Sequence, residues 1–176
     1  DLFQRRSPLG LVATRIDAET GRWRSNTATI GSYCDSFFEY LWDGWDLFGD
    51  AECKAMYDQC TAAVLKHQQV WKDGQLWFAD VDCDTGAIVS TDQDELASFY
   101  GGLLGQGGER KLGAACTESW ARVQDRYGIL PEGYDYATAL PTQKSNALRP
   151  ELADSAFTLW LLDKKPRWRE IGAAHF

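Results

Sequence analysis

Two acidic side chains, Asp35 and Glu39, lie in the first turns of a predicted helix, where a carboxylate could take part in chemistry. Gly31 marks a turn, and Asp35 and Ser36 follow it with side-chain oxygens that can bind free backbone N–H groups. Glu39 comes four residues after Asp35, so both carboxylates are predicted on one helix face. The same pattern also suits an ordinary helix start, because an acid there gains about 0.3–1 kcal/mol from the helix dipole.

A second helix start of the same character lies within Leu148–Ser155. Pro150 suits a position near the first helical residue, because the N–H group that proline lacks would have no helical partner there. Glu151 and Asp154 follow Pro150 in the predicted first turn. Two helix starts that both carry acids predict a shared pocket.

The elements that must position these acids are mainly helices. The predicted helices cover Asp35–Phe48, Ala51–Trp71, Asp92–Leu104, Glu109–Tyr127, Pro150–Leu162 and the residues from Pro166 onward. Two short β-hairpins are predicted, one pairing Leu11–Ile16 with Arg22–Arg24 and one pairing Gln75–Val81 with Ala87–Ser90. Gly128–Asn146, which is rich in Pro, Gly and Tyr, is predicted as a loop. The predicted fold class is therefore all-α with small β-hairpins.

A repeat relates the helices to one another. Leu47, Leu104 and Leu161 each close the first helix of a pair, and they follow one another at intervals of 57 residues. The repeat predicts an array of three helical hairpins, in which each pair covers the apolar face of its neighbour. Each first helix begins near an acid, so parallel stacking would bring these acids to one end of the array. The acids are Asp35, Asp94 or Glu95, and Glu151.

Composition excludes several classes of function. The 176 residues suit one domain, and a net charge of −8 without a basic stripe argues against nucleic acid as a partner. No run of about 18 apolar residues is present, so no membrane span is predicted in this chain. The five cysteines show no metal-ligand spacing and allow two disulfides at most, and small buried thiols are the prediction for them.

Several segments together resemble glycoside hydrolase family 47, the class I α-mannosidases. Gly31–Leu41 matches the family's Gly-x-x-x-Asp-Ser-Phe/Tyr-Tyr/Phe-Glu-Tyr-Leu motif, and Leu148–Ser155 matches Leu-Arg-Pro-Glu-x-x-Glu-Ser except that Asp154 replaces the second Glu. Gly128–Glu132 resembles the family's Gly-Leu-x-Pro-Glu, and Leu9–Trp23 resembles the hairpin before the first motif. The resemblance covers nearly the whole chain in the family's order. The most similar branch is that of the degradation-enhancing mannosidase-like proteins and their bacterial relatives.

The resemblance implies that residues 1–176 belong to one glycosidase domain, an (α/α)7 barrel of paired helices. Only the middle of that domain is represented, because two family motifs are missing, one with a proposed general acid and one with a calcium-binding Thr. Three hairpins cannot close a ring of seven, so the remainder of the domain or polypeptide is an expected partner. The resemblance also implies the secretory pathway, or a bacterial periplasmic or secreted location, and the sequence itself leaves the compartment open.

The function implied by the resemblance is removal of terminal α-1,2-linked mannose from mannose-rich glycans by an inverting, calcium-dependent glycoside hydrolase. Glu151 matches the residue assigned as the general base, which agrees with a helix start that favours an ionised carboxylate. Asp35 matches a second acid that is needed for catalysis, and the usual proton donor would lie outside this chain. The alternative is a lectin-like protein that binds mannose-bearing glycans without cleaving them.

Further residues are predicted to line the sugar pocket: Glu39, Glu95, Glu132, Arg149 and Asp154. Glu132 and Asp154 match acids that hold calcium-bound water, so they are predicted to contact Ca²⁺ only through water, and no residue of this chain is predicted as a direct ligand. Arg149 could bind a sugar hydroxyl group or pair with a neighbouring acid. Glu95 stands where many family members carry His, and Tyr33 stands where the best-known processing enzymes carry Arg, which leaves the branch preference open.

Both edges of a segment taken from a closed ring are predicted to expose apolar side chains, because their neighbours are absent. These edge residues are Phe3, Leu9 and Leu11 near one end, and Trp160, Trp168 and Phe176 near the other. The chain by itself is therefore expected to be poorly soluble and inactive.

Overall fold

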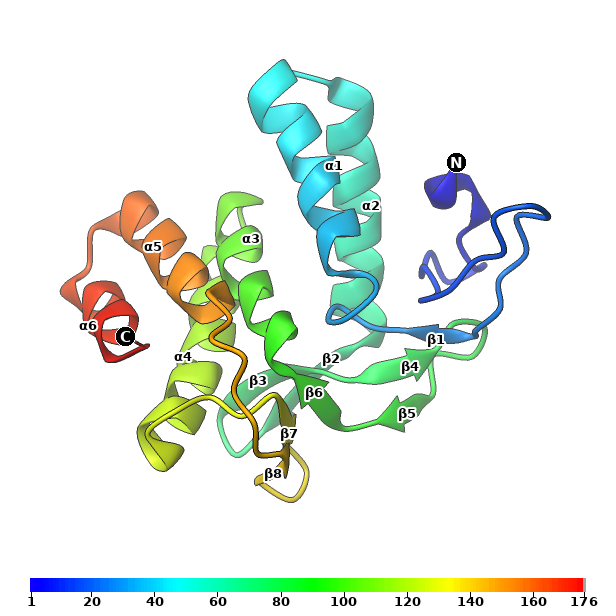
Figure 1. Ribbon diagram of the computed structural model, residues 1–176. Coiled ribbons are helices and arrows are strands. Elements are labelled where there is room, and N and C mark those ends of the chain that lie inside the picture. Colours follow the sequence, from blue (N-terminus) through cyan, green and yellow to red (C-terminus); the bar gives the residue numbers. More distant parts are fainter. Residues whose placement is uncertain (176) are drawn as a thin grey trace. The chain divides into compact units, whose positions relative to one another are not determined.

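The computed structural model describes residues 1–175 and shows a chain that packs as two compact units (Figure 1). Unit one comprises Asp1–Val70 and Phe78–Thr91, and unit two comprises Trp71–Trp77 and Asp92–Phe176. The chain leaves unit one within β2 (Gln69–Lys72) and returns to it within β3 (Gln75–Phe78), and these two strands pair with each other. Both units combine helical hairpins with a small antiparallel sheet, which confirms the prediction of a mainly helical fold with small β elements.

The helical hairpin of unit one consists of α1 (Asp35–Phe48) and α2 (Ala51–His67), which pack against each other (Figure 1). The bounds of α1 are those predicted from the sequence. Gly49 ends α1 in a left-handed conformation with φ of 68°, which glycine adopts without a steric penalty. Asp50 then begins α2, because its carboxylate accepts hydrogen bonds from two N–H groups of the first turn.

A three-stranded antiparallel sheet completes unit one, with β1 (Thr27–Ala28), β4 (Asp80–Asp82) and β5 (Ile88–Ser90) in that spatial order. The side-chain amide of Gln68, at the end of α2, is buried and donates hydrogen bonds of 3.2 and 3.1 Å to two backbone carbonyls at this sheet. The pairing of its NH2 group matters, because an unmade hydrogen bond in the core costs about 1–3 kcal/mol. Gln68 therefore fixes the end of α2 against the sheet.

Three predictions in unit one and its connection are wrong in detail. Leu11–Ile16 is not a regular strand, and a single bridge between Ile16 and Trp23 replaces the predicted hairpin. The helix expected to reach Trp71 ends at His67, because β2 (Gln69–Lys72) pairs with β3 instead. The long strand expected after it is divided into β3 (Gln75–Phe78) and β4. A short Leu2–Arg5 3₁₀ helix, η1, precedes these elements.

Unit two contains the other two helical hairpins (Figure 1). The first pairs α3 (Tyr100–Gln106) with α4 (Arg110–Tyr127), and the second pairs α5 (Glu151–Asp163) with α6 (Pro166–His175). Because α3 packs against both α4 and α5, the two hairpins stack beside each other as the repeat predicts.

The sheet of unit two is antiparallel, with β6 (Asp92–Asp94), β7 (Gly133–Asp135) and β8 (Leu140–Gln143) in that order. The helix predicted from Asp92 was wrong at its start, because the first three residues form β6 and Glu95–Phe99 forms a 3₁₀ helix, η2. The segment predicted as a loop before α5 supplies β7 and β8. Strand pairing with a distant segment therefore overrides the local helical pattern at these residues.

The core of unit two is aromatic. Trp77, which is 2% exposed, packs its ring against those of Trp120, Tyr134 and Tyr136 at centroid distances of 5.3, 5.5 and 5.7 Å. Offset and edge-to-face contacts of this kind each contribute about 0.5–1.5 kcal/mol beyond burial of their area. The cluster joins β3 to α4 and β7, which fixes the sheet that carries Glu95 and Glu132 at its ends.

The predicted exposure of the edge residues is wrong for two of them. Leu11 and Trp168 are buried, with 2% and 4% of their surfaces exposed. Phe3, Leu9 and Trp160 are half-buried, and Phe176 lies outside the described residues.

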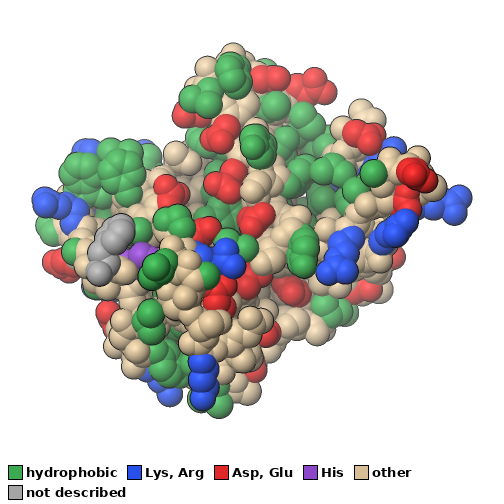
Figure 2. Space-filling model, viewed as in Figure 1, with side chains coloured by type: hydrophobic (Ala, Val, Ile, Leu, Met, Phe, Trp, Pro, Cys, Tyr) green, Lys and Arg blue, Asp and Glu red, His purple; other side chains and the backbone are tan. Residues whose placement is uncertain are grey.

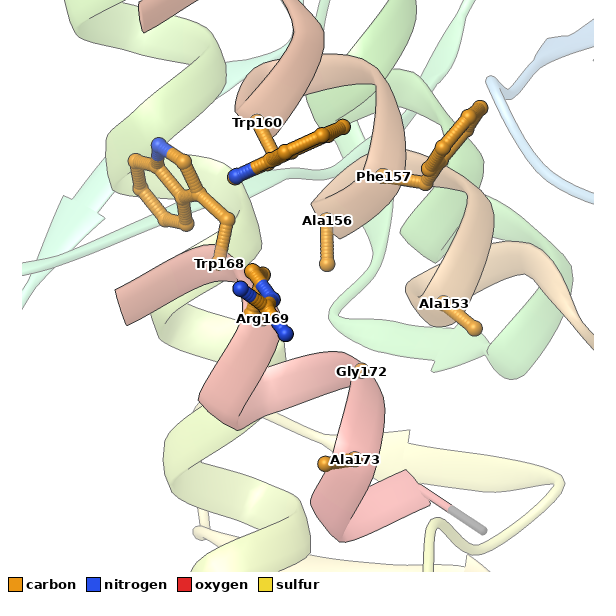
Figure 3. Close-up of a pocket in the computed structure, with 8 residues that line it drawn as sticks. All are labelled: Ala153, Ala156, Phe157, Trp160, Trp168, Arg169, Gly172 and Ala173. Atoms are coloured by element: carbon orange, nitrogen blue, oxygen red, sulfur yellow. The ribbon is translucent and has the colours of Figure 1, made fainter. Parts of the chain in front are cut away.

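An apolar groove of about 670 Å³ lies between α5 and α6 (Figure 3). Phe157 and Trp160 of α5 line it together with Trp168 of α6, and the rings of Phe157 and Trp160 stack at 6.2 Å. Phe157 is 57% exposed, and hydrophobic side chains gather over α5 on the face seen in Figure 2. Apolar surface is therefore uncovered along this hairpin, although Trp168 itself is packed.

Backbone contact between α3 and α4 yields a prediction for the stability of unit two. A Cβ added to Gly113 would lie 2.4 Å from the Gly101 carbonyl oxygen and 2.8 Å from the Gly105 nitrogen. Because backbone atoms cannot move aside, Gly113→Ala should force the helices apart and lower the free energy of unfolding by about 1–3 kcal/mol. Urea unfolding of the complete protein measures this, with Arg122→Ala on the exposed side of α4 as a control expected within about 0.5 kcal/mol. Equal stabilities of the two variants would contradict the close helix contact.

Candidate active site

Glu151 is the first residue of α5, as the sequence predicts. Pro150 precedes it and makes no side-chain cap, and Glu151 and Asp154 supply the negative charge that this helix end favours. Glu151 is half-buried and Asp154 is exposed. The start of α5 is therefore an acidic helix end that is partly covered by the rest of unit two.

The segment before α5 is held by an ion pair between Glu132 and Arg149. Arg149 Nε donates a hydrogen bond of 2.8 Å to one carboxylate oxygen of Glu132, and the N–H of Ala147 donates one of 2.8 Å to the other. The Glu132 side chain is 13% exposed, and its hydrogen bond raises the pKa of Arg149. Of the two roles considered for Arg149, the structure shows the pairing with a neighbouring acid.

A histidine that the sequence did not assign to the site also holds Arg149. His175 Nε2 donates a hydrogen bond of 2.7 Å to the backbone carbonyl of Arg149, and His175 Nδ1 lies 2.9 Å from the side-chain amide of Gln124. The imidazole therefore links α6 and α4 to the residue that precedes Pro150. The only local signal was a histidine in the last turn of a helix, which favours a role in capping rather than in positioning a loop.

Ser155 is a further positioning residue, and it closes the motif that begins at Leu148. Its hydroxyl is fully buried, accepts a hydrogen bond of 2.8 Å from the N–H of Gly102, and lies 2.7 Å from the carbonyl oxygen of Ser98. These contacts connect the first turns of α5 to α3 and η2. The motif itself was the signal, because the sequence placed Ser155 one turn after Glu151.

Glu95, the first residue of η2, is fully buried, with 0% of its surface exposed. Its N–H donates a hydrogen bond of 3.0 Å to the carbonyl oxygen of Glu132. Neither carboxyl oxygen has a hydrogen-bond partner among residues 1–175. Burial, together with the negative charges of Glu132 and Glu151, raises the pKa of Glu95 to about 7, and the positive charge of Arg149 opposes this shift.

The structure thus brings together Glu95, Glu132, Arg149 and Glu151, all in unit two. Among these four residues, Glu95 is fully covered. The expectation that Glu95 contacts substrate stays a prediction. Asp154 adds an exposed acid on the same first turn as Glu151.

Asp35 and Glu39 belong to unit one, where both are half-buried on α1. Cys34, rather than Asp35 or Ser36, is the residue that precedes the helix, and Asp35 accepts a hydrogen bond of 2.8 Å from the N–H of Ser36. Tyr33 just before it is 70% exposed and has a positive φ of 77°, an uncommon backbone conformation for a tyrosine. The expected closeness of Asp35 to Glu151 stays a prediction.

Among the described residues, neither the cysteines nor the side chains that could bind a metal form a further candidate site. All five cysteines are free thiols, four of them buried, and burial raises the pKa of Cys34 and Cys116 to about 12, so neither is a nucleophile near neutral pH. Within residues 1–175, no three His, Cys, Asp or Glu side chains form a group that could hold a metal ion. No helix in the same range has the length and hydropathy needed to cross a membrane.

A carboxylate at a helix start beside a buried carboxyl group with a raised pKa suits glycosidases, because they need carboxyl groups in different protonation states. Stacked helical hairpins that carry such acids agree with the class of protein that the motifs predict.

The chain belongs to glycosyl hydrolase family 47, whose sequence profile matches residues 1–176. It is 35% identical to alpha-mannosidase I MNS4 of Arabidopsis thaliana and 31% identical to the ER degradation-enhancing alpha-mannosidase-like protein 2 of Homo sapiens, each over 173 residues and 97% of this chain. It spans 27% and 29% of the lengths of these relatives. The family predicted from the motifs is confirmed, and degradation-enhancing proteins are among the relatives.

A solved structure has a similar fold. The alpha-1,2-mannosidase from Trichoderma reesei superposes with a TM-score of 0.77 at 19% sequence identity, and the match covers 89% of this chain and 39% of that one. The arrangement of helices and small sheets therefore agrees with part of that larger fold.

The raised pKa of Glu95 predicts how stability depends on pH. The unfolded chain releases this proton near the ordinary value of 4.5 and the folded chain near 7, so the stabilising contribution is complete below about pH 4.5 and is lost as pH rises through 7. The shift corresponds to about 3 kcal/mol at most. Glu95→Gln, which cannot ionise, should therefore lose less stability between pH 5 and pH 8 than the natural protein, as measured by urea unfolding. Glu109→Gln, at an exposed glutamate, is the control and should keep the natural slope; a natural slope in Glu95→Gln would contradict the raised pKa.

Proposed function

We propose that the complete protein hydrolyses terminal α-1,2-linked mannose from mannose-rich glycans with inversion of configuration. The observation that carries the proposal is the position of Glu151 at the open start of α5, beside Glu95, Glu132 and Arg149. The names of relatives support the linkage, since one of them is a mannosyl-oligosaccharide alpha-1,2-mannosidase IA, from Spodoptera frugiperda, 30% identical over 186 residues.

In the proposed reaction, Glu151 is the general base. Its carboxylate takes a proton from a water molecule while that water attacks the anomeric carbon of the terminal mannose. A proton donor from the remainder of the domain protonates the glycosidic oxygen as the bond breaks, and the sugar leaves with inverted configuration. Asp35 is the second catalytic acid of this chain, and inversion requires about 6.5–9.5 Å between the acting carboxyl groups so that water fits between them.

Pocket residues and calcium complete the proposal. Glu39, Glu132 and Asp154 would bind sugar hydroxyl groups or ordered water, and Arg149 would act by holding Glu132 in place. Calcium is part of the proposal as a cofactor whose direct ligands lie in the remainder of the domain. Glu132 and Asp154 would contact it only through water, and no step of the reaction described above depends on the ion.

The remainder of the domain is the proposed partner of this chain. The chain spans about a quarter to a third of the lengths of its relatives, and the α5–α6 groove leaves Phe157 57% exposed. Packing of further helical hairpins of the same domain on this groove would bury that surface and continue the array toward an (α/α)7 barrel.

Replacement of the proposed base gives a direct test. In the complete protein, Glu151→Gln should lower kcat on an α-1,2-linked mannobiose by at least about 100-fold, because an amide cannot take a proton from water. Mannoside binding, measured by calorimetry, should persist, because the amide keeps the shape of the side chain. Glu109→Gln makes the same chemical change outside the site and should keep full activity. Unchanged turnover in Glu151→Gln would remove it as the base, and a natural protein that binds mannosides without any turnover would favour the lectin-like alternative.

The uncovered groove between α5 and α6 leads to a prediction for the solubility and activity of the 176 residues expressed alone. We expect this segment to be poorly soluble and inactive on the mannobiose, even with added Ca²⁺, because the α5–α6 surface is uncovered and the proton donor is missing. Phe157→Ser should improve the soluble yield, whereas Leu152→Ser, at a buried residue of the same helix, should lower it. A soluble segment that melts cooperatively and hydrolyses the substrate would show that the domain is complete without further helices.

A further inference from the structure

Gln124 of α4 is a buried polar side chain to which the reaction described above gives no role. Only 3% of its surface is exposed. The amide oxygen Oε1 lies 2.9 Å from His175 Nδ1, and the amide nitrogen Nε2 is buried with no hydrogen-bond partner among residues 1–175. An unpaired polar atom in the core costs about 1–3 kcal/mol. The contact with His175 is therefore the feature of this amide that needs an explanation.

The hydrogen-bond requirements of the imidazole decide which end of the amide must face it. His175 Nε2 lies 2.7 Å from the carbonyl oxygen of Arg149, which can only accept, so Nε2 carries a proton. In a neutral ring Nδ1 is then an acceptor, and it needs a donor rather than an oxygen. The two ends of a glutamine amide have nearly the same shape, so the network assigns them. With the ends exchanged, the NH2 group of Gln124 donates to His175 Nδ1, and one buried oxygen is left unpaired instead of two N–H groups.

The carbonyl that His175 holds belongs to a residue that is fixed at its other end as well. The guanidinium of Arg149 donates to Glu132, and the backbone carbonyl of Arg149 accepts from His175. This carbonyl is part of the planar peptide bond to Pro150, whose ring restricts φ. The carbonyl of Pro150 in turn accepts a hydrogen bond of 2.8 Å from the N–H of Asp154 in the first turn of α5. The orientation of one peptide plane therefore sets the direction in which α5 begins.

We propose that Gln124 and His175 are positioning residues for the general base. His175 holds the Arg149 carbonyl, and Gln124 donates to His175 Nδ1 and so keeps the proton of the neutral ring on Nε2, where the carbonyl needs it. The inference rests on the proposed function and adds to it the residues that set the place of Glu151. No proton is transferred along this series of contacts, which acts on geometry alone.

A cavity beside these residues makes the proposal testable with a small molecule. It has a volume of about 380 Å³, and Gln124, Arg149 and His175 line it together with residues of the neighbouring segments. Removal of the His175 side chain would leave a space that joins this cavity. Free imidazole could enter that space and replace the missing ring.

Replacement of the histidine tests its role in positioning. In the complete protein, His175→Ala should lower kcat on the mannobiose about 10–100-fold with little change in KM, because Glu151 is displaced while the sugar contacts remain. Added imidazole should recover at least about fivefold of this loss. His67→Ala, at the other histidine of the chain, should keep full activity and should not respond to imidazole. An unchanged kcat in His175→Ala, or a loss that imidazole does not reduce, would overturn the proposal.

A double-mutant cycle tests whether Gln124 acts through His175. Gln124→Leu should lower kcat about 3–10-fold in the natural background and should cause no further loss in His175→Ala, because the ring that it orients is absent. Gln106→Leu, at an exposed glutamine of α3, should have no effect in either background. Losses that multiply in the double variant would show that Gln124 acts independently of His175 and would overturn its assigned role.

The position of the ring proton can be measured in the natural protein without turnover and without any variant. Long-range ¹H–¹⁵N NMR spectra of the neutral ring should show the proton of His175 on Nε2 and none on Nδ1. A proton on Nδ1 would mean that the oxygen of Gln124 faces the ring, and it would overturn the proposal. If the natural protein shows no hydrolysis of the mannobiose at all, the proposed function fails, and these spectra still decide whether Gln124 and His175 are paired as inferred.

Discussion

The ion pair between Glu132 and Arg149 is the interaction on which the arrangement of unit two depends. It joins the segment before β7 to the segment before α5, which are 17 residues apart in sequence. A hydrogen bond between charged partners is worth about 1.5–3 kcal/mol, more than most single contacts on a protein surface. Because Arg149 is separated from Glu151 only by Pro150, fixing the guanidinium also fixes where α5 begins.

Other contacts converge on the same short segment. His175 binds the carbonyl of Arg149 from α6, and Ser155 connects the first turns of α5 to η2 and α3. The close backbone approach of α3 and α4 at Gly113 holds the helices that these contacts reach. A carboxylate that must act as a base within about 0.5 Å of its productive position needs support of this kind, because a side chain at a helix end is otherwise mobile.

The buried Glu95 lowers the stability of unit two when its carboxyl group ionises. A glutamine or an apolar residue in its place would avoid placing an ionisable group beside two carboxylates, and it would remove the loss of stability that accompanies a rise in pH. An acid is present there instead, in η2, which packs against the helix that carries Glu151. Groups that cost stability in this way are characteristic of sites where protonation matters to the chemistry.

Local patterns in the sequence determined the helical hairpins, the bounds of α1, the acid at the start of α5 and the family of the chain. Each of these is set by neighbours within a few residues, through helix periodicity, a glycine at a helix end, a proline before the first turn or a continuous motif. Only the tertiary structure decided that Asp92–Asp94 is a strand, that Glu95 is buried and that Arg149 pairs with Glu132. The partners in these cases are β7 for Asp92–Asp94, the start of α5 for Glu95 and Glu132 for Arg149, between 17 and 56 residues away. Burial and charge depend on which distant segments meet, and no local pattern carries that information, because the same Asp-Gln-Asp-Glu run could begin a solvated helix just as well.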